Sequence, residues 1–258
     1  MKAKTILAHE AKFIETGIDS LGKKFKLTNK KVDVPGETKK LTIIQCKREN
    51  SDESFFYKEA TQKDKIVLHF TAGYLKGDIA TLTTPGNHVS VSYVIGRSGN
   101  IFQLFDDSYW SYHLGPGASG GNTAMSKSSI GIEISNIGYL KKVGENFVSA
   151  YSNDDIYCSQ SEVSYFKTLG APFRAQKYFA TFTNEQYDNL VLLLKYLLQK
   201  HPTVNRTLLD INSRYQYLTD LGMLKGILSH VNFRENGKWD IGPGFEWAKI
   251  EGVAQVPG

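Results

Sequence analysis

The chain has 258 residues, a hydrophobic fraction of 41%, and 14 Tyr and 14 Phe, enough apolar material for one large domain or for one domain with an extension. No stretch approaches the roughly 18–20 consecutive apolar residues of a transmembrane helix, so we expect no membrane insertion. The formal net charge is +5; residues 1–65 hold 15 basic and 10 acidic residues, so the rest balances to zero and carries no electrostatic footprint for nucleic acid.

The N-terminus begins with basic residues but has only a short apolar run, Ile6–Ala8. A secretory signal needs an apolar region of roughly 7–15 residues. We therefore expect a protein that is made in the cytoplasm without a signal peptide. If its substrate lies outside the cytoplasm, another route must deliver the protein.

Residues 1–62 are interpreted as a basic, β-rich N-terminal extension, because strand-like runs flank the turn signal Pro35-Gly36. Four roles stay open for this segment and its excess positive charge: adhesion to anionic envelope polymers, covering the sheet of the following domain, docking to delivery machinery, or a solvated face without a function. We favour a targeting or docking element outside the catalytic site.

Residues 63–258 carry the clearer patterns. Strands are predicted at Lys65–Phe70, in a hairpin formed by Val89–Gly96 and Ile101–Phe105, at Ser128–Asn136 and at Gly226–His230. In the segment Ser128–Asn136, Ile130, Ile132 and Ile134 alternate onto one face and leave Glu133 on the other.

Helices are predicted between these strands. The strongest follows Thr183, which has capping-box spacing to Gln186, and ends at His201-Pro202. A weaker helix is expected over Leu208–Leu218, whereas residues 140–182 show no pattern and are interpreted as a loop-rich insertion. Strands with interspersed helices predict an α/β fold, a mixed central β-sheet flanked by helices.

Two cysteines, Cys46 and Cys158, are too few for a disulfide framework, and separate free thiols are the simpler interpretation.

Two of the six histidines stand where strands end. His69 closes an apolar strand, His230 closes another, and Asp240 follows ten residues later. Two imidazoles and one carboxylate suit a catalytic zinc with a fourth position left for water. On their own, three such residues are a weak signal.

The segments around these residues strengthen the signal. Five segments occur in a fixed order along the chain. They are LHFTAG at His69, VSVSYVIGRSGNIFQLF, WSYHLG at His113, SIGIEISN at Glu133, and an ending that contains SH, Asp240, Gly-Pro, Phe and Trp. Together they resemble the zinc-dependent N-acetylmuramoyl-L-alanine amidases, the type 2 amidase and peptidoglycan-recognition-protein superfamily, over about Lys63 to Trp247.

The resemblance implies specific roles. One Zn²⁺ per chain is expected on His69, His230 and Asp240, as in the branch of the family with an Asp ligand. The matching catalytic residues are Glu133 and Lys238. His113, in the position of the usual WHAG histidine, and nearby Trp110 are expected to contact substrate.

Departures from the family pattern affect the cleft. Val91 holds the place of a catalytic tyrosine of the phage-type enzymes, so the burden falls on Glu133. WHAG reads YHLG, and Gly237 replaces the usual arginine before Lys238.

The implied activity is hydrolysis of the amide between N-acetylmuramic acid and L-alanine of the stem peptide. Zinc would lower the pKa of water and polarise the carbonyl. Glu133 would take the proton of the water as general base, and Lys238 would stabilise the oxyanion.

Three settings are weighed. We favour a wall-degrading lysin or effector that binds peptidoglycan or muropeptides after delivery by a holin or an injection apparatus. A cytosolic muropeptide-recycling amidase is the first alternative. A non-catalytic peptidoglycan-recognition module is the second, although such modules typically lack the metal-binding residues that are present here.

Overall fold

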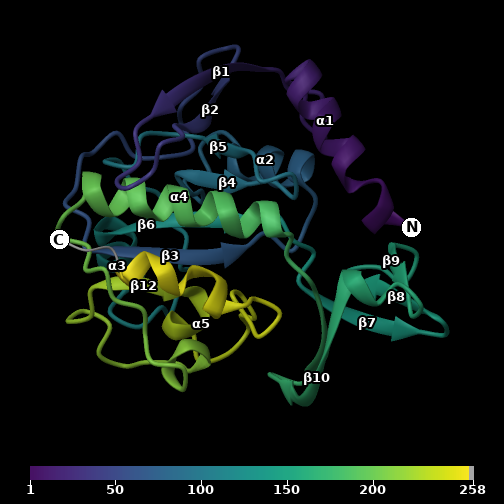
Figure 1. The fold of residues 1–258 in the computed structure, drawn as a ribbon. Coiled ribbons are helices and arrows are strands. Elements are labelled where there is room, and N and C mark those ends of the chain that lie inside the picture. Colours follow the sequence, from purple (N-terminus) through teal and green to yellow (C-terminus); the bar gives the residue numbers. More distant parts are fainter. Residues whose placement is uncertain (256–258) are drawn as a thin grey trace.

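The computed structural model describes residues 1–255 and is built around a seven-stranded sheet in the order β1-β2-β5-β4-β6-β3-β12 (Figure 1). Its strands are β1 (Phe25–Val32), β2 (Leu41–Arg48), β3 (Lys65–Phe70), β4 (Tyr93–Ile95), β5 (Ile101–Gln103), β6 (Ser129–Ile134) and β12 (Gly226–Ser229). β1 with β2 and β4 with β5 pair antiparallel, and the other neighbours pair parallel. The predicted mixed sheet is confirmed.

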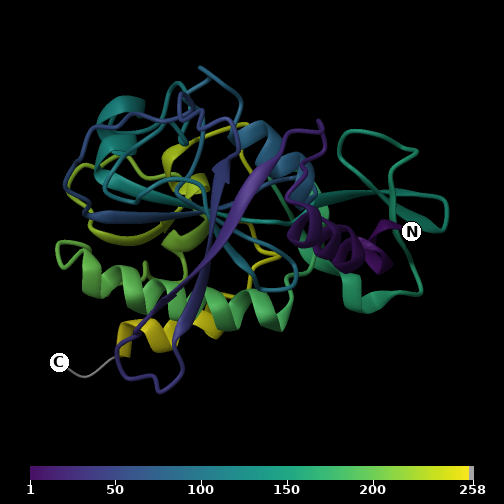
Figure 2. The same cartoon turned by 90° about the horizontal axis from the view of Figure 1, so that it is seen from above.

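One face of this sheet is covered by α4 (Asn184–Lys200). The alternating Ile130, Ile132 and Ile134 of β6 pack on this side together with the leucines of the helix. The predicted capping box is present, since the Thr183 side chain accepts from the Gln186 backbone and the Gln186 side chain accepts from the Thr183 backbone. The C-terminal 3-10 helix, Trp247–Gln255, lies on the same face (Figure 2).

The opposite face, called the α2 face here, is covered by four short helices. These are α1 (Ile6–Thr16), α2 (Leu75–Leu82), α3 (Asn122–Ser128) and α5 (His230–Phe233). Side chains that alternate away from α4, such as Val67 of β3 and Val94 of β4, pack on this side. Since His69 and Glu133 follow the same alternation, both side chains point to the α2 face.

Residues 1–62 are built into this architecture. β2 pairs with β5 and β1 pairs with β2, so both extend the central sheet, and Phe13 of α1 is fully buried against Phe25 and Phe102. The buried Glu10 carboxylate accepts from the backbone amides of Arg97 and Ser98. The division at residue 62 stays a prediction, but the segment before it shares a core with β5 of the central sheet.

The prediction of a patternless loop after residue 140 was wrong. The segment forms a separate five-stranded antiparallel sheet, seen beside the main body in Figure 1, in the order β10-β11-β7-β8-β9. Its strands are β7 (Tyr139–Val143), β8 (Asn146–Ser149), β9 (Ile156–Ser159), β10 (Phe166–Phe173) and β11 (Gln176–Ala180). The strands are short and many of their side chains are exposed, so apolar alternation is weak.

Smaller differences concern element ends. The predicted helix at Leu208–Leu218 is wrong, because the structure has only a short 3-10 turn there, Ser213–Tyr215. The last strand ends at Ser229, and His230 begins α5. Cys46 and Cys158 are free and buried on different strands. Among residues 1–255, no helix combines the length and the apolar character that a membrane span requires.

Candidate metal centre and catalytic cavity

Sheet pairing brings the three predicted metal ligands together. β12 runs parallel to β3 with Ser229 opposite Leu68, so the next residues, His230 and His69, meet at the same edge. Asp240 returns on the following loop, where its carbonyl accepts from the Val231 amide at 2.8 Å. Each ligand is therefore held by backbone pairing close to it in the chain.

The three side chains form one buried cluster, called the metal cluster here. The Nδ1 atoms of His69 and His230 lie 2.9 Å apart. Asp240 Oδ2 lies 3.1 Å from the first and 2.8 Å from the second. All three residues are buried, and their ligand atoms lie within 4.8 Å of one another.

The hydrogen bonds of the outer ring nitrogens show that this cluster suits a cation. His230 Nε2 lies 2.9 Å from the Leu114 carbonyl, which can only accept, so this nitrogen carries the proton. His69 Nε2 lies 3.0 Å from His113 Nδ1. If both outer nitrogens donate, two imidazole lone pairs and a carboxylate oxygen converge on one point. This N, N, O set is one that zinc prefers.

Electrostatics favour the metal-binding forms of His69 and Asp240. Burial lowers the pKa of His69 to about 4, and the neighbouring His230 acts in the same direction, so the ring stays neutral. Burial alone would raise the pKa of Asp240, but the two histidines hold it well below the ordinary value. Neutral imidazoles and an ionised carboxylate are the forms that bind metal.

Glu133 lies directly beside the metal cluster, since it pairs with His69 in the parallel register of β3 and β6. Its Oε2 atom is buried and has no hydrogen-bond partner in the described part of the chain. Burial raises the pKa of this carboxyl well above the ordinary value, Asp240 and Asp78 add to the rise, and Lys238 opposes it. Burying a carboxyl oxygen without a hydrogen-bond partner destabilises the fold. Such a group beside a cation site is therefore a candidate for a catalytic role.

These residues line one cavity of about 320 Å³. Glu133, Lys238, His230 and Asp240 all contribute to its lining. Val91, in the place of the family tyrosine, forms part of the wall without offering a polar group. The volume lies at the lower end of the range for small-ligand sites.

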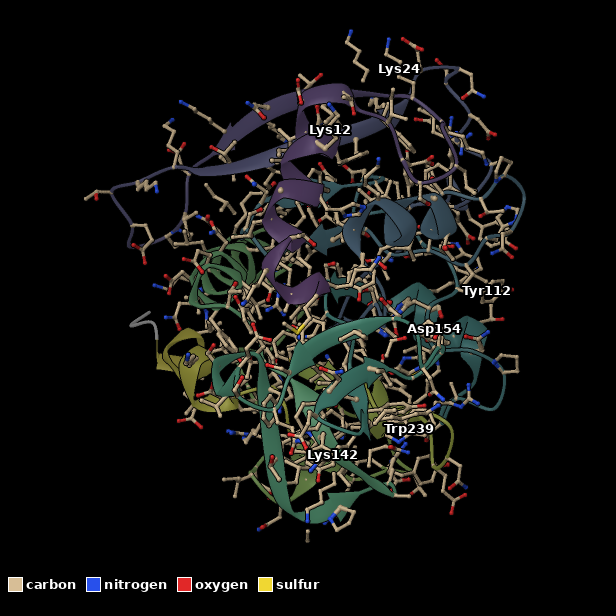
Figure 3. The ribbon with its side chains drawn as sticks, turned by 90° about the vertical axis from the view of Figure 1, so that its right-hand side faces the viewer. Lys12, Lys24, Tyr112, Lys142, Asp154 and Trp239 are labelled. Carbon is tan, nitrogen blue, oxygen red and sulfur yellow. The ribbon has the colours of Figure 1, made fainter. Side chains whose placement is uncertain are left out.

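The five-stranded sheet supplies another wall of this cavity, which sequence reasoning missed. Tyr139 of β7 and Tyr151 of the β8–β9 turn line it, and the Tyr139 ring lies 4.8 Å from that of Trp239. Figure 3 shows Asp154, in the same turn as Tyr151, between the labelled wall residues Tyr112 and Trp239. Tyr151 is the one aromatic residue of this turn, residues 150–155, so no local pattern in the sequence pointed to it.

Arg174 links that sheet to the loop that carries Lys238 and Asp240. Its guanidinium donates to three carbonyls, those of Val231, Arg234 and Lys238, the last at 2.6 Å. In return, Trp239 Nε1 donates to the Arg174 carbonyl at 3.0 Å. No local pattern reveals this contact, because its partners lie about sixty residues further along the chain.

The two predicted substrate contacts differ in their positions. His113 lines the cavity, and both of its ring nitrogens bond to protein partners, His69 and Ser129. Trp110 lies outside the residues that line the cavity: its ring stacks on Tyr57 with centroids 4.2 Å apart, and its Nε1 donates to Glu59. The structure therefore brings together every predicted site residue except Trp110.

Comparison with known proteins gives a consistent result. The family described as N-acetylmuramoyl-L-alanine amidase matches residues 59–244. The chain is 26% identical over 199 residues to the N-acetylmuramoyl-L-alanine amidase AmiD of Escherichia coli strain K12, covering 74% of this chain and 54% of AmiD. It thus spans about half the length of that relative.

The E. coli AmiD structure supports the fold. The E. coli AmiD structure, in complex with the substrate anhydro-N-acetylmuramic acid-L-Ala-D-γ-Glu-L-Lys, has a TM-score of 0.50 at 21% identity, covering 76% of this chain and 59% of that one. AMPDH3 from Pseudomonas aeruginosa has a TM-score of 0.47 at 18% identity, covering 76% and 61%.

Proposed function

We propose, because the chain belongs to the N-acetylmuramoyl-L-alanine amidase family, that it hydrolyses the amide between the lactyl group of N-acetylmuramic acid and L-alanine of the stem peptide. The observation that carries this proposal is one cavity whose lining includes His230 and Asp240 of the metal cluster, the unpartnered carboxyl of Glu133 and Lys238. An amide needs an activated water and a stabilised oxyanion, and these groups can supply both.

His69, His230 and Asp240 would hold the zinc, which when bound lowers the pKa of water and polarises the scissile carbonyl. Glu133 takes a proton from the attacking water and returns it to the leaving amine of L-alanine. Burial, which raises the pKa of Glu133, makes its carboxylate a stronger base towards that proton. Lys238 offers positive charge to the carbonyl oxygen as it becomes an oxyanion.

The walls of the cavity support a muropeptide as substrate. AmiD, which this chain resembles, is known in complex with an anhydro-muropeptide, and we extend that substrate class to this protein. Tyr139, Tyr151 and Trp239 present aromatic surface to the cavity, where sugar rings or a peptide backbone can pack. The elements that supply Tyr139 and Tyr151 are the small sheet and its β8–β9 turn.

We further propose that the protein acts on the cell wall as a bacteriolytic lysin or effector, and that a holin or an injection apparatus delivers it there. Exposed lysines along the β1–β2 hairpin, including Lys26, Lys30 and Lys31, support a role for this segment in contacting anionic wall polymers or delivery machinery. Figure 3 shows Lys24 projecting from the same region. The recycling alternative also has an observation in its favour, because the ligand in the AmiD structure is an anhydro-muropeptide.

The test is digestion of purified sacculi and of soluble anhydro-muropeptides, with products identified by mass spectrometry. We expect free stem peptides with an L-alanine amino terminus and intact glycan strands. Cut glycan, or cleavage within the peptide, would contradict the proposed reaction. Turnover of soluble muropeptides with no attack on sacculi would instead favour the recycling setting.

A further inference from the structure

The outer nitrogens of the two histidine ligands are bound by neighbouring residues. His69 Nε2 lies 3.0 Å from His113 Nδ1, and His230 Nε2 lies 2.9 Å from the carbonyl of Leu114. The segment His113-Leu114 therefore contacts both imidazoles on the side away from the metal cluster. The Leu114 carbonyl can only accept, so His230 Nε2 must donate to it. The bond between His69 and His113 can run in either direction, because a histidine nitrogen either donates or accepts.

The direction of the bond between His69 and His113 is set by Ser129. The Ser129 hydroxyl donates to the Met125 carbonyl at 2.6 Å, so its oxygen is left to accept from His113 Nε2 at 2.9 Å. A neutral His113 that carries its proton on Nε2 has only a lone pair on Nδ1. It must then accept from His69 Nε2.

This direction decides whether His69 can bind a metal. With its proton on Nε2, His69 turns a lone pair on Nδ1 towards His230 and Asp240. The opposite direction would place the proton on Nδ1 and point it into the metal cluster, which excludes ligation through that atom. The chain from Met125 through Ser129 and His113 thus selects the binding tautomer.

Packing holds His113 in this position. Its ring meets that of His69 edge-on, with centroids 5.1 Å apart and planes at 79°. On its other side lies Gly131 of β6, where an added Cβ would come within 3.2 Å of the His113 ring and 2.7 Å of Val91 Cγ1. Glycine at this position leaves the room that the ring occupies.

We propose that His113 is a positioning residue for the metal ligand His69, with Ser129 fixing the tautomer of His113, and that it does not bind substrate through a hydrogen bond. Both of its ring nitrogens are already engaged with the protein. The proposal rests on the metal cluster of the proposed function, and it replaces the substrate contact that the family resemblance implied for this residue.

The test measures zinc affinity of the full chain by competition with a chromophoric chelator. His113→Ala should weaken zinc binding by about 10–100-fold, the usual effect of removing a hydrogen-bonding partner of a metal ligand. His113→Asn should retain most of the affinity, because the amide oxygen stands where Nδ1 was and can only accept. Ser129→Ala should weaken binding less than His113→Ala, since the neutral ring can still adopt either direction.

The two positions should also depend on each other. In the His113→Asn background, Ser129→Ala should have no further effect on zinc affinity, because the shorter side chain has no atom in the place of Nε2 with which to contact Ser129. Cobalt-substituted His113→Ala should show an altered visible spectrum, and the His113→Asn protein a nearly native one. His88→Ala is the matched control, since His88 stacks on Tyr57 outside the metal cluster and should leave affinity unchanged.

Unchanged zinc affinity in His113→Ala together with a raised KM would overturn the proposal and return His113 to substrate binding. Equal losses in the Ala and Asn variants would also contradict it, because only a general packing role would produce them. A wild-type protein that binds zinc but cleaves no muropeptide would refute the proposed function alone, since the affinity measurements do not depend on turnover.

Discussion

Two histidine–aspartate groups in this molecule, each with a buried aspartate, use similar residue types in different ways. One is the metal cluster of His69, His230 and Asp240. The other, called the α4 cap here, lies where α4 ends: the fully buried Asp107 accepts from Lys200 Nζ and from His201 Nε2, both at 2.6 Å. Neighbouring groups lower the pKa of the aspartate in both places.

The difference lies in where protons and lone pairs point. In the α4 cap each donor meets an acceptor, so the group is complete within the protein. In the metal cluster two ring nitrogens and a carboxylate oxygen face one another, because their outer partners take the protons on the other side. A histidine beside a buried aspartate therefore does not by itself identify a metal site; the direction of the hydrogen bonds at the outer ring nitrogens does.

The largest expected effect separates the two groups by zinc content. His230→Ala should reduce bound zinc from one ion per chain to near zero and abolish hydrolysis, because the two remaining ligands seldom hold a catalytic zinc. His201→Ala should keep one zinc per chain. Elemental analysis of dialysed protein measures both, and equal zinc content in the two variants would contradict the distinction between the two groups.

A second prediction separates binding of the metal from catalysis. Glu133→Gln should retain zinc and lose activity on the order of 10²–10⁴-fold, since the general acid–base is removed while the side chain keeps its shape. Lys238→Ala should lose about 10²–10³-fold if its ammonium stabilises the oxyanion. Steady-state rates on a soluble muropeptide, paired with zinc content, check both. Near-normal turnover in the Glu133 variant would assign the base elsewhere.

Much of this site could be predicted from local pattern. β3 and β6 follow from apolar runs and alternation, and α4 follows from its apolar stripe and its cap, because these signals lie within a few residues. The metal ligands needed the family resemblance as well, since residues as far apart as His69 and Asp240 meet only through sheet pairing.

The parts that were missed depend on contacts between distant segments. The small sheet has short, partly exposed strands whose apolar alternation is weak, so no local period marks it. The engagement of both His113 nitrogens depends on Ser129 and on the end of β3, and no spacing in the sequence specifies that. The position of residues 1–62 in the sheet likewise depends on pairing between β2 and β5.

A third prediction tests whether contacts from the small sheet hold the metal cluster in position. In the described part of the chain, the α4 cap makes no such contacts. Arg174→Ala removes three hydrogen bonds, one to α5 at Val231 and two to the loop that follows it and carries Lys238 and Asp240. We expect kcat to fall by up to about 10²-fold, the cost of a displacement near 1 Å in a catalytic group. The kcat of Arg174→Lys should lie between that of the wild type and that of Arg174→Ala, because an ammonium lacks the planar set of donors of a guanidinium.

The control for this prediction is Lys177→Ala. Lys177 is exposed on β11, and its replacement by alanine also removes one positive charge. It should leave kcat unchanged. If both variants lose activity equally, net charge of the small sheet is responsible and the Arg174 contacts are not. Determination of kcat and KM on the same muropeptide distinguishes displaced catalytic groups from weaker substrate binding.

The smallest expected effect is on stability, and it belongs to the α4 cap. Burial would raise the pKa of Asp107, but hydrogen bonds from His201 and Lys200 outweigh it and lower the pKa to about 2, below the ordinary 3.8. A carboxyl whose folded pKa is depressed stabilises the fold above its ordinary pKa, and this stabilisation is lost as the pH falls towards about 2. The difference is worth on the order of 2 kcal/mol.

Asp107→Asn should therefore lower the free energy of unfolding by about 2 kcal/mol at pH 7, with the gap to wild type narrowing as the pH falls from about 4 towards 2. Zinc content and kcat should not change, since the α4 cap has no part in the cavity. Urea unfolding of both proteins at pH 7 and pH 3 measures the gap, with the exposed Asp154→Asn as a control expected to stay within about 0.5 kcal/mol. A gap that is equal at both pH values would mean that Asp107 acts through packing, and the contrast between the two histidine–aspartate groups would then rest on the metal cluster alone.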